Sequence, residues 1–110
     1  MLYLFSVIAN RTFEYIATRE EMSAIDVFND KIEAAGQRIL AVGIADPSSA
    51  EVFDNRNGAG KTFTGPVVDA DEFVAGFWVI EAESREIARQ LAIEASFACN
   101  RKIEMRQILG

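Results

Sequence analysis

The fold is decided by the stretch Thr64-Gly-Pro-Val-Val-Asp-Ala-Asp-Glu-Phe-Val-Ala-Gly-Phe-Trp-Val-Ile-Glu-Ala-Glu83. It begins with a Gly-Pro turn, passes through an acidic cluster, and is then apolar from Phe73 to Ile80. Successive side chains of a strand point to opposite faces of its sheet, and here both sets are apolar. We therefore predict a strand in the middle of a sheet whose two faces are both covered. The two predicted sets are Val74, Gly76, Trp78 and Ile80 on one face and Phe73, Ala75, Phe77 and Val79 on the other.

The rest of the chain alternates between strand and helix signals. The stretch from Leu2 to Ala9 is again apolar on both sides and predicts a second central strand. A capping box, Thr18-Arg-Glu-Glu21, predicts a helix that runs to about Ala35 and ends at Gly36. Ser84 is expected to cap a second helix, with Glu86 in its first turn. The other predicted strands cover residues 38–45, 50–54, 61–64 and 102–109. The two short ones are expected to form a hairpin across residues 55–60, with Asn57-Gly58 as its turn pair.

The resulting order is strand, helix, strand, hairpin, strand, helix, strand. It is typical of the α+β, ferredoxin-like split βαβ fold, in which the first and third main strands are central. We predict one domain over residues 1–110, with a four-stranded antiparallel sheet, two helices on one face and a β-hairpin insertion. Because two helices cover only one face, the apolar opposite face predicts a homodimer in which two sheets pack face to face.

Composition and charge narrow the classes of function. The net charge of −6 and the pI near 4.6 argue against binding to nucleic acid or to an anionic membrane surface, because both need clustered Lys and Arg. The apolar run from Leu2 to Ala9 is too short to span a bilayer. The single Cys99 cannot form an internal disulfide, which fits a reducing cytoplasm. The chain has no histidine, the usual general base and the commonest transition-metal ligand, and we predict neither a metal nor a cofactor.

A carboxylate cluster lies between the Gly-Pro turn and the central strand, at Asp69, Asp71 and Glu72. When two carboxylates lie close together at an apolar opening, their repulsion raises the pKa of one of them. Asp69 or Glu72 could then act as a general acid or base. The alternative is a solvated acidic loop that leads into the strand. That alternative is the commoner one, since no third catalytic group is evident beside the cluster.

Four further residues are candidates for ligand binding. Arg106 could present a cation to an anionic ligand, although an arginine on an edge strand more often faces solvent. Tyr15 and Trp78 could line a pocket, but aromatic residues on such elements are more often found in the core or the dimer interface. Thr64, at the Gly-Pro turn, is the fourth candidate.

Two other features of the sequence, a glycine-rich run and the single cysteine, do not indicate a functional site. Gly58-Ala-Gly-Lys-Thr62 is similar to a phosphate-binding loop, but Phe63-Thr-Gly-Pro66 follows it where that loop requires a helix. We therefore exclude phosphate binding there. Cys99 has no histidine to activate it, and we interpret it as an inert packing residue.

Three segments together resemble the YCII-related family, in its DGPF-type branch. The signature turn reads Thr64-Gly-Pro-Val67, the glycine pair of the next strand reads Ala75-Gly-Phe77, and the closing segment reads Asn100-Arg-Lys-Ile-Glu-Met-Arg106. The likeness is strongest over roughly the last fifty residues, and the element order also agrees over the first part of the chain. The resemblance implies a dimeric α+β barrel in a family of mostly unassigned biochemical role. It also implies a link to a few relatives, in the family and the wider superfamily, that handle small aromatic-derived ring compounds as isomerases or dehydrochlorinases.

The chain departs from the family pattern at two positions. The resemblance implies a proposed acid–base pair, a histidine on the first helix and an aspartate in the signature, but this chain has Met22 and Thr64 at those places. That pair therefore cannot be carried over. We predict a small dimeric barrel that binds a small, ring-containing organic molecule. Two alternatives stay open, namely a weak lyase or isomerase that uses Asp69 or Glu72, and a non-catalytic accessory or interaction module.

Overall fold

The computed structural model describes residues 1–11 and 17–110, which form strands and helices in the predicted order. Two short 3₁₀ turns, η1 (Pro47–Ser49) and η2 (Arg56–Gly58), lie in the connections. The longer elements are β1 (Leu2–Asn10), α1 (Arg19–Ala34), β2 (Arg38–Gly43), β3 (Glu51–Asp54), β4 (Lys61–Thr64), β5 (Glu72–Glu81), α2 (Arg85–Cys99) and β6 (Lys102–Gln107).

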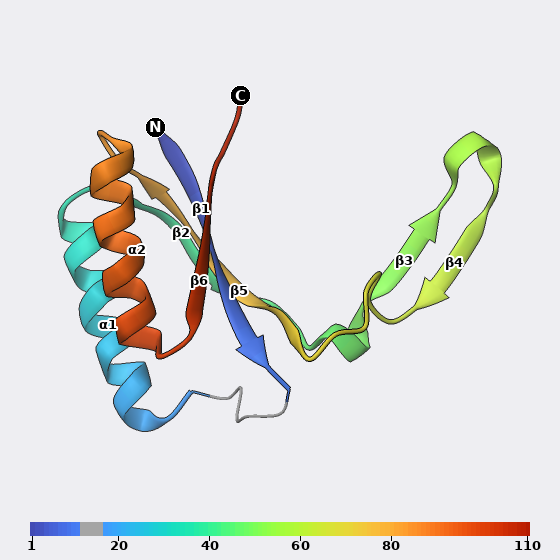
Figure 1. Cartoon of the computed structure of the whole chain (residues 1–110), viewed down its shortest axis with the longest axis horizontal. Helices are drawn as coiled ribbons and strands as arrows, with labels where there is room; N and C mark the ends of the chain where they lie inside the picture. The colour runs from blue at the N-terminus through green and yellow to red at the C-terminus, as the bar shows by residue number, and fades with distance from the viewer. Residues whose placement is uncertain (12–16) are drawn as a thin grey trace.

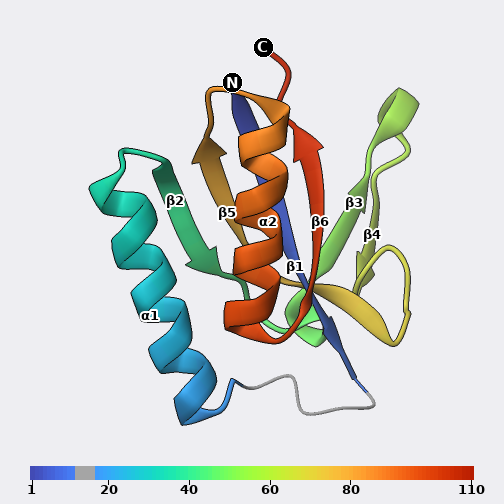
Figure 2. The same cartoon turned by 60° about the vertical axis from the view of Figure 1, so that its left-hand side comes forward.

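The main sheet has the strand order β2-β5-β1-β6, and all its neighbours are antiparallel. The two strands that are apolar on both faces, β1 and β5, are therefore central, as predicted. Helices α1 and α2 lie side by side on one face of this sheet (Figures 1 and 2). The predicted α+β, ferredoxin-like fold is confirmed, including the hairpin insertion, which forms a separate two-stranded sheet of β3 and β4.

The helix ends follow the local sequence signals. Thr18 Oγ1 accepts a hydrogen bond from the amide of Glu21 (3.1 Å), and Glu21 Oε1 accepts one from the amide of Thr18 (2.9 Å). This reciprocal pair confirms the capping box. Gly36, with φ +71°, follows the end of α1 in the left-handed conformation that favours glycine. Ser84 Oγ accepts from the amide of Ile87 (3.2 Å) and caps α2.

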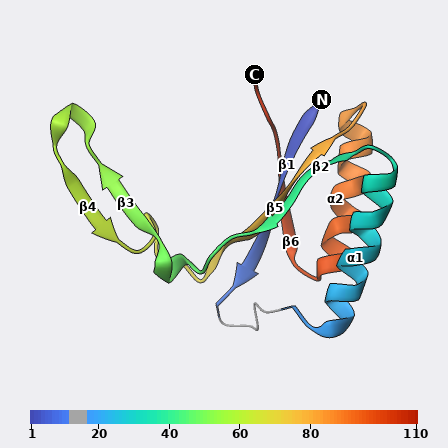
Figure 3. The ribbon, with the colours of Figure 1, turned by 180° about the vertical axis from the view of Figure 1, so that it is seen from behind.

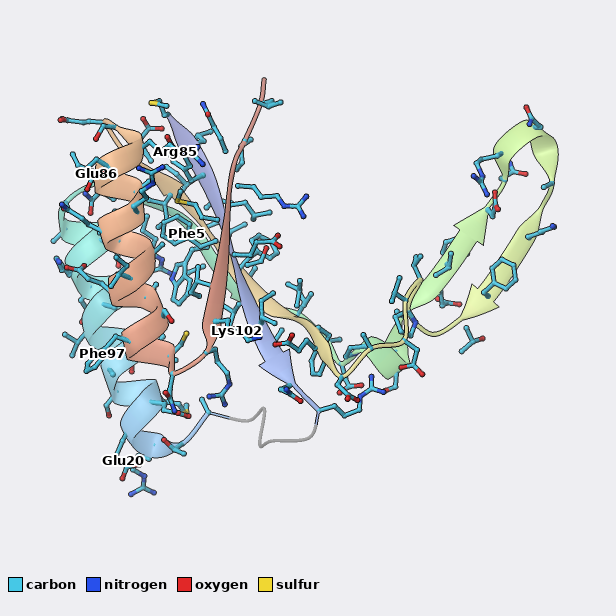
Figure 4. All side chains as sticks on the ribbon, viewed as in Figure 1. Phe5, Glu20, Arg85, Glu86, Phe97 and Lys102 are labelled. Carbon is cyan, nitrogen blue, oxygen red and sulfur yellow. The ribbon has the colours of Figure 1, made fainter. Side chains whose placement is uncertain are left out.

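The core lies between the two helices and the sheet face that they cover, here called the helix face. Phe28 of α1 packs edge-on against Trp78 of β5, with ring centroids 5.4 Å apart and planes at 81°. Figure 4 shows Phe5 pointing from β1 into this layer. The residues of the core cluster are Tyr3, Phe5, Phe28, Ile32, Trp78, Ile80, Ala82, Ala88, Leu91, Ala95, Ala98 and Cys99.

One expectation about β5 is wrong. Val74 was predicted to share a face with Gly76, but the register of β1 and β5 shifts between Val7, which pairs with Gly76, and Ile8, which pairs with Val74. The skipped residue, Ala75, makes a β-bulge that reverses the alternation of side chains below it. Val74 therefore lies beside Ile8, on the face away from the helices.

The opposite face of the sheet, here called the open face, has an apolar part and a charged edge. The apolar part lies on β2, β5 and β1. Strand β6 forms the charged edge, where Lys102 pairs with Glu72 and Arg106 Nε lies 2.9 Å from Glu104 Oε1. Strand register and alternation place the following apolar residues on this face: Leu4, Ile8, Leu40, Val42, Val74, Phe77 and Val79.

The hairpin of β3, η2 and β4 (residues 51–64, here called the arm) projects from the body on the side away from the helices (Figures 1 and 3). Asn57 and Gly58 at its tip both have positive φ, 54° and 72°, which is the backbone that the Asn-Gly pair predicted. Lys61 begins strand β4, so the glycine-rich run leads into a strand and lacks the helix that a phosphate loop needs.

Candidate functional site: a pocket between helix α1 and the sheet

A pocket of about 340 Å³ opens between α1 and the helix face of the sheet (here called the α1 pocket). Helix α1 contributes Ile25 and Asn29, which are four residues apart and therefore on one side of the helix. No charged side chain lies among the described residues around it. The lining residues are Val7, Ala17, Ile25, Asn29, Ala41, Val42, Gly43, Ala75, Gly76, Phe77, Trp78 and Cys99.

The polar centre of the pocket is a hydrogen bond between Trp78 and Asn29. The indole Nε1 of Trp78 donates to Oδ1 of Asn29 at 2.7 Å. Because an indole N–H can only donate, it selects the oxygen of the amide and turns Nδ2 away from the ring. That nitrogen makes no hydrogen bond with the part of the chain that the structure describes. Asn29, which lines the pocket, therefore has an amide donor that no described residue uses.

Two glycines widen the sheet side of the pocket. Gly76 of β5 faces Gly43 of β2, and the strands come so close that a Cβ on Gly76 would lie 2.6 Å from the carbonyl oxygen of Val42. A Cβ on Gly43 would meet only the carbonyl oxygen of Ala75, at 3.8 Å. Glycine is thus required at position 76 by close backbone approach, whereas position 43 has room for a methyl group.

Cys99, at the end of α2, is the only other heteroatom side chain among the described lining residues. Burial raises the pKa of its thiol above the ordinary value of 9.0, so the thiol stays protonated at neutral pH. Its sulfur lies 3.9 Å from the carbonyl oxygen of Ser96 and is buried. These features support the interpretation of Cys99 as a packing residue.

The structure brings together two of the residues predicted from sequence, Thr64 and Asp69. Both line a groove of about 570 Å³ at the base of the arm, which also contains Arg11. Asp69 Oδ1 accepts a hydrogen bond from Arg11 Nη1 at 3.0 Å, and its side chain is 78% exposed. Arg11 also lies over the ring of Phe73, 5.9 Å from its centroid. Asp69 is thus a solvated, ion-paired carboxylate.

The other predicted residues are dispersed. Glu72 forms an ion pair with Lys102, and the side chain of Glu72 is 44% exposed. In the described part of the chain, Asp69 is bonded to Arg11 and not to Glu72. Arg106 lies at the charged edge of the open face, whereas Trp78 is buried on the helix face. Tyr15 lies outside the described residues. Among the candidates from sequence that the structure describes, Trp78 is the one that lines the α1 pocket.

Asn29 was missed as a site residue. The sequence carried a signal for it, because Asn29 is a polar residue within the apolar stripe formed by Ile25, Phe28 and Ile32. Met22, at the place where the family pattern has a histidine, is an exposed residue near the start of α1. It is not part of the pocket lining that the structure describes.

Metal ligands and membrane-spanning helices were also sought in the described residues. Within residues 1–11 and 17–110, no three His, Cys, Asp or Glu side chains are grouped so as to hold a metal ion. Over the same residues, neither helix has the length and apolar character that crossing a bilayer requires.

This fold and pocket define a small α+β protein of the ferredoxin-like class, with an uncharged hollow beneath its first helix. The chain belongs to the YCII-related family, because the model of the YCII-related domain matches residues 1–109. No curated protein matches the chain.

Proposed function

We propose that the protein binds a small, uncharged, ring-containing organic molecule in the α1 pocket. The observation that carries the proposal is a hollow of about 340 Å³ that pairs an aromatic wall, Trp78, with a polar group, Asn29. Ligand sites are typically apolar hollows of about 300–1,000 Å³ with a few placed polar groups. The volume lies at the small end of that range, which favours a single substituted ring.

The charge of the ligand follows from the lining. A charged group that enters a pocket without a counter-charge loses its favourable hydration, and no ion pair in the pocket replaces that free energy. The described lining has no charged side chain, and the available donor is the neutral amide nitrogen of Asn29. A neutral carbonyl or hydroxyl oxygen on the ring is the group that this donor would recognise.

Catalysis through Asp69 or Glu72, the alternative from sequence, receives no support from their surroundings. Both carboxylates are ion-paired and open to water, and neither lines the α1 pocket. The proposed function is therefore binding, without a chemical step assigned to this chain. Replacement of Asp69 by Asn is expected to leave binding in the pocket unchanged.

The test compares benzamide with benzoate, which has the same ring and similar size but a negative charge. Trp78 is the single tryptophan, so its fluorescence reports on the pocket directly. We expect saturable quenching by benzamide and at least tenfold weaker binding of benzoate. The absence of saturable binding by benzamide and by other neutral monocyclic compounds would contradict the proposal.

Two neighbouring residues of β2 supply matched variants. Ala41 pairs with Trp78 and lines the pocket, whereas Leu40 pairs with Val79 on the open face. Ala41→Phe should fill the hollow and abolish benzamide binding. Leu40→Phe adds a comparable ring on the other side of the same strand and should leave binding intact. Equal effects of the two variants would show that the ligand does not bind in the α1 pocket.

A further inference from the structure

The outer side of the two helices, which faces away from the sheet, has exposed apolar side chains. Val27 on α1 is 70% exposed, and Ile93 and Phe97 on α2 are 71% and 90% exposed. Phe97 lies in the helix layer, far from the arm (Figure 4). Val, Ile and Phe are weaker helix formers than Ala, Lys or Glu, so at exposed positions they favour neither the helix nor solubility. Exposed apolar residues that gather in one place mark an interaction surface.

The three side chains lie together on the helix layer. Lys31 Nζ of α1 forms an ion pair with Glu94 Oε2 of α2 at 2.7 Å. The two helices lie side by side and run in opposite directions (Figures 1 and 2). Val27, one turn before Lys31, is therefore level with Phe97, one turn after Glu94. Ile93 is four residues before Phe97 and shares its side of α2. We call Val27, Ile93 and Phe97 the outer patch.

Two carboxylates beside the outer patch have no counter-charge in the described part of the chain. Asp26 and Asp30 of α1 are exposed, and neither forms an ion pair with a described residue. Asp30 is three residues after Val27, so the two are neighbours on the helix surface. Asp26 and Asp30 are four residues apart, a spacing at which like charges destabilise a helix. A cation placed between them would relieve that repulsion.

The cations near the outer patch do not supply that charge. Lys31 is held by the ion pair that joins the helices, and Arg89 Nη1 lies 3.7 Å from Glu86 Oε2. Arg19 is two turns before Asp26, about 10 Å along the axis of α1, which is beyond ion-pair distance. The outer patch therefore has an apolar centre and an acidic side that the described residues do not neutralise.

We propose that the outer patch binds an amphipathic helix of a different protein, one with basic residues beside its apolar face. Apolar side chains of that helix would cover Val27, Ile93 and Phe97, and a Lys or Arg would meet Asp26 and Asp30. An amphipathic helix that lays its apolar face on an apolar surface is a recurring mode of protein recognition. The surface lies on the outer side of α1, whereas the α1 pocket lies on the inner side, and the proposal does not rest on ligand binding there.

Charge disfavours the other occupants of this surface. A second copy of the chain in a two-fold pair would bring four carboxylates into one contact with no cation between them. Nucleic acid and an anionic membrane surface carry negative charge as well. The net charge of −6 also attracts a basic partner over a longer range than the contact itself.

The test uses a designed peptide of leucine, alanine and lysine in amphipathic helical order, about 18 residues long because shorter helices are marginal in water. The control peptide has glutamate in place of lysine. Amide shifts of the isotope-labelled full chain follow both titrations by nuclear magnetic resonance. We expect saturable shifts in residues 23–31 and 90–97, with the glutamate peptide binding at least about tenfold more weakly. Equal binding of the two peptides, shifts confined to other regions, or no saturable binding at about 1 mM peptide would overturn the proposal.

The variant Phe97→Ser tests the apolar contact. Because Phe97 is almost wholly exposed, its replacement should preserve the fold, and it should weaken binding of the lysine peptide at least about tenfold. Leu109→Ser is the matched control, since Leu109 is 86% exposed near the C-terminus and outside the helix layer. It should bind like the wild type. Equal losses in the two variants would mean adhesion to any exposed apolar residue and would overturn the proposal.

The variant Asp26→Asn/Asp30→Asn tests the charge. It should weaken binding of the lysine peptide at least about threefold and reduce the dependence of the dissociation constant on salt. Glu51→Gln/Asp71→Asn removes two exposed charges from the arm side of the molecule and should have a smaller effect. Equal effects would show that only net charge matters. Shifts of the outer patch when the chain is concentrated without peptide would place a second copy there. Either result would refute the proposal.

Discussion

The indole nitrogen of Trp78 on β5 donates a 2.7 Å hydrogen bond to Oδ1 of Asn29 on α1. This bond joins the central strand to the first helix beside the pocket, so it contributes both to stability and to the shape of the candidate site. Trp78 also packs edge-on against Phe28, which keeps the indole in one orientation. Asn29 is thereby held with its oxygen toward the ring.

Removal of the acceptor should therefore cost stability. In Asn29→Ala the buried indole N–H loses its partner, and a buried unpaired donor costs about 1–3 kcal/mol in the free energy of unfolding. Chemical denaturation measures the difference. Asp30→Ala, at the next position of α1 on its exposed side, should change that free energy by less than about 0.5 kcal/mol. An Asn29→Ala protein as stable as the wild type would show that water replaces the amide oxygen without loss.

The facing glycines of β2 and β5 make a second pair for comparison. Gly76→Ala places a methyl group 2.6 Å from the carbonyl oxygen of Val42, a backbone atom that cannot move without distorting the strand. We expect a loss of about 1–3 kcal/mol in the free energy of unfolding, typical of overpacking. Gly43→Ala has ordinary contact distances and should be tolerated. Thermal unfolding of both variants checks the prediction, and a reversal of their order would contradict it.

The capping box predicts a pH dependence. The hydrogen bond from the Thr18 amide, followed by the side chain of Asn100 and the charge of Arg101, lowers the pKa of Glu21 below its ordinary value of 4.5. A carboxylate whose pKa is lowered on folding stabilises the protein above its unfolded-state pKa, and this contribution is lost as pH falls through the lower folded-state pKa.

The variant Glu21→Gln tests the direction of this pH dependence of stability. At neutral pH the variant should be less stable, by about 0.3–1 kcal/mol as expected for a charge at a helix start. The difference from wild type should shrink as the pH falls below 4.5 through the folded-state pKa and vanish beneath it. Urea unfolding at a series of pH values measures it. A constant difference across that range would mean that the charge of Glu21 is not involved.

The two faces of β5 should respond differently to polar substitution. Ile80 is fully buried against the helices, so Ile80→Asp places an unpaired charge in the core and should prevent folding. Val79 lies on the open face, and Val79→Thr should preserve the fold of the single chain. Circular dichroism separates the two outcomes. Recovery of a soluble, stable Ile80→Asp monomer would show that the helix face does not require apolar cover.

The sequence by itself determined the elements and their order. Capping residues mark the helix starts at Thr18 and Ser84, because they satisfy backbone amides only a few residues away. Strands β1 and β5 are apolar on both faces, and that property predicts central positions in the sheet. These signals are local or depend on composition, so they can be read without knowing the fold.

Only the tertiary structure decided which side chains meet. The bulge at Ala75 depends on the register between β1 and β5, and it moved Val74 to the open face. Register likewise separated Arg106 from Trp78, and it placed Glu72 beside Lys102. Asn29 became a site residue because α1 packs over Trp78, a contact between positions 49 residues apart in sequence. Contacts of this kind depend on the packing of whole elements, which local spacing does not encode.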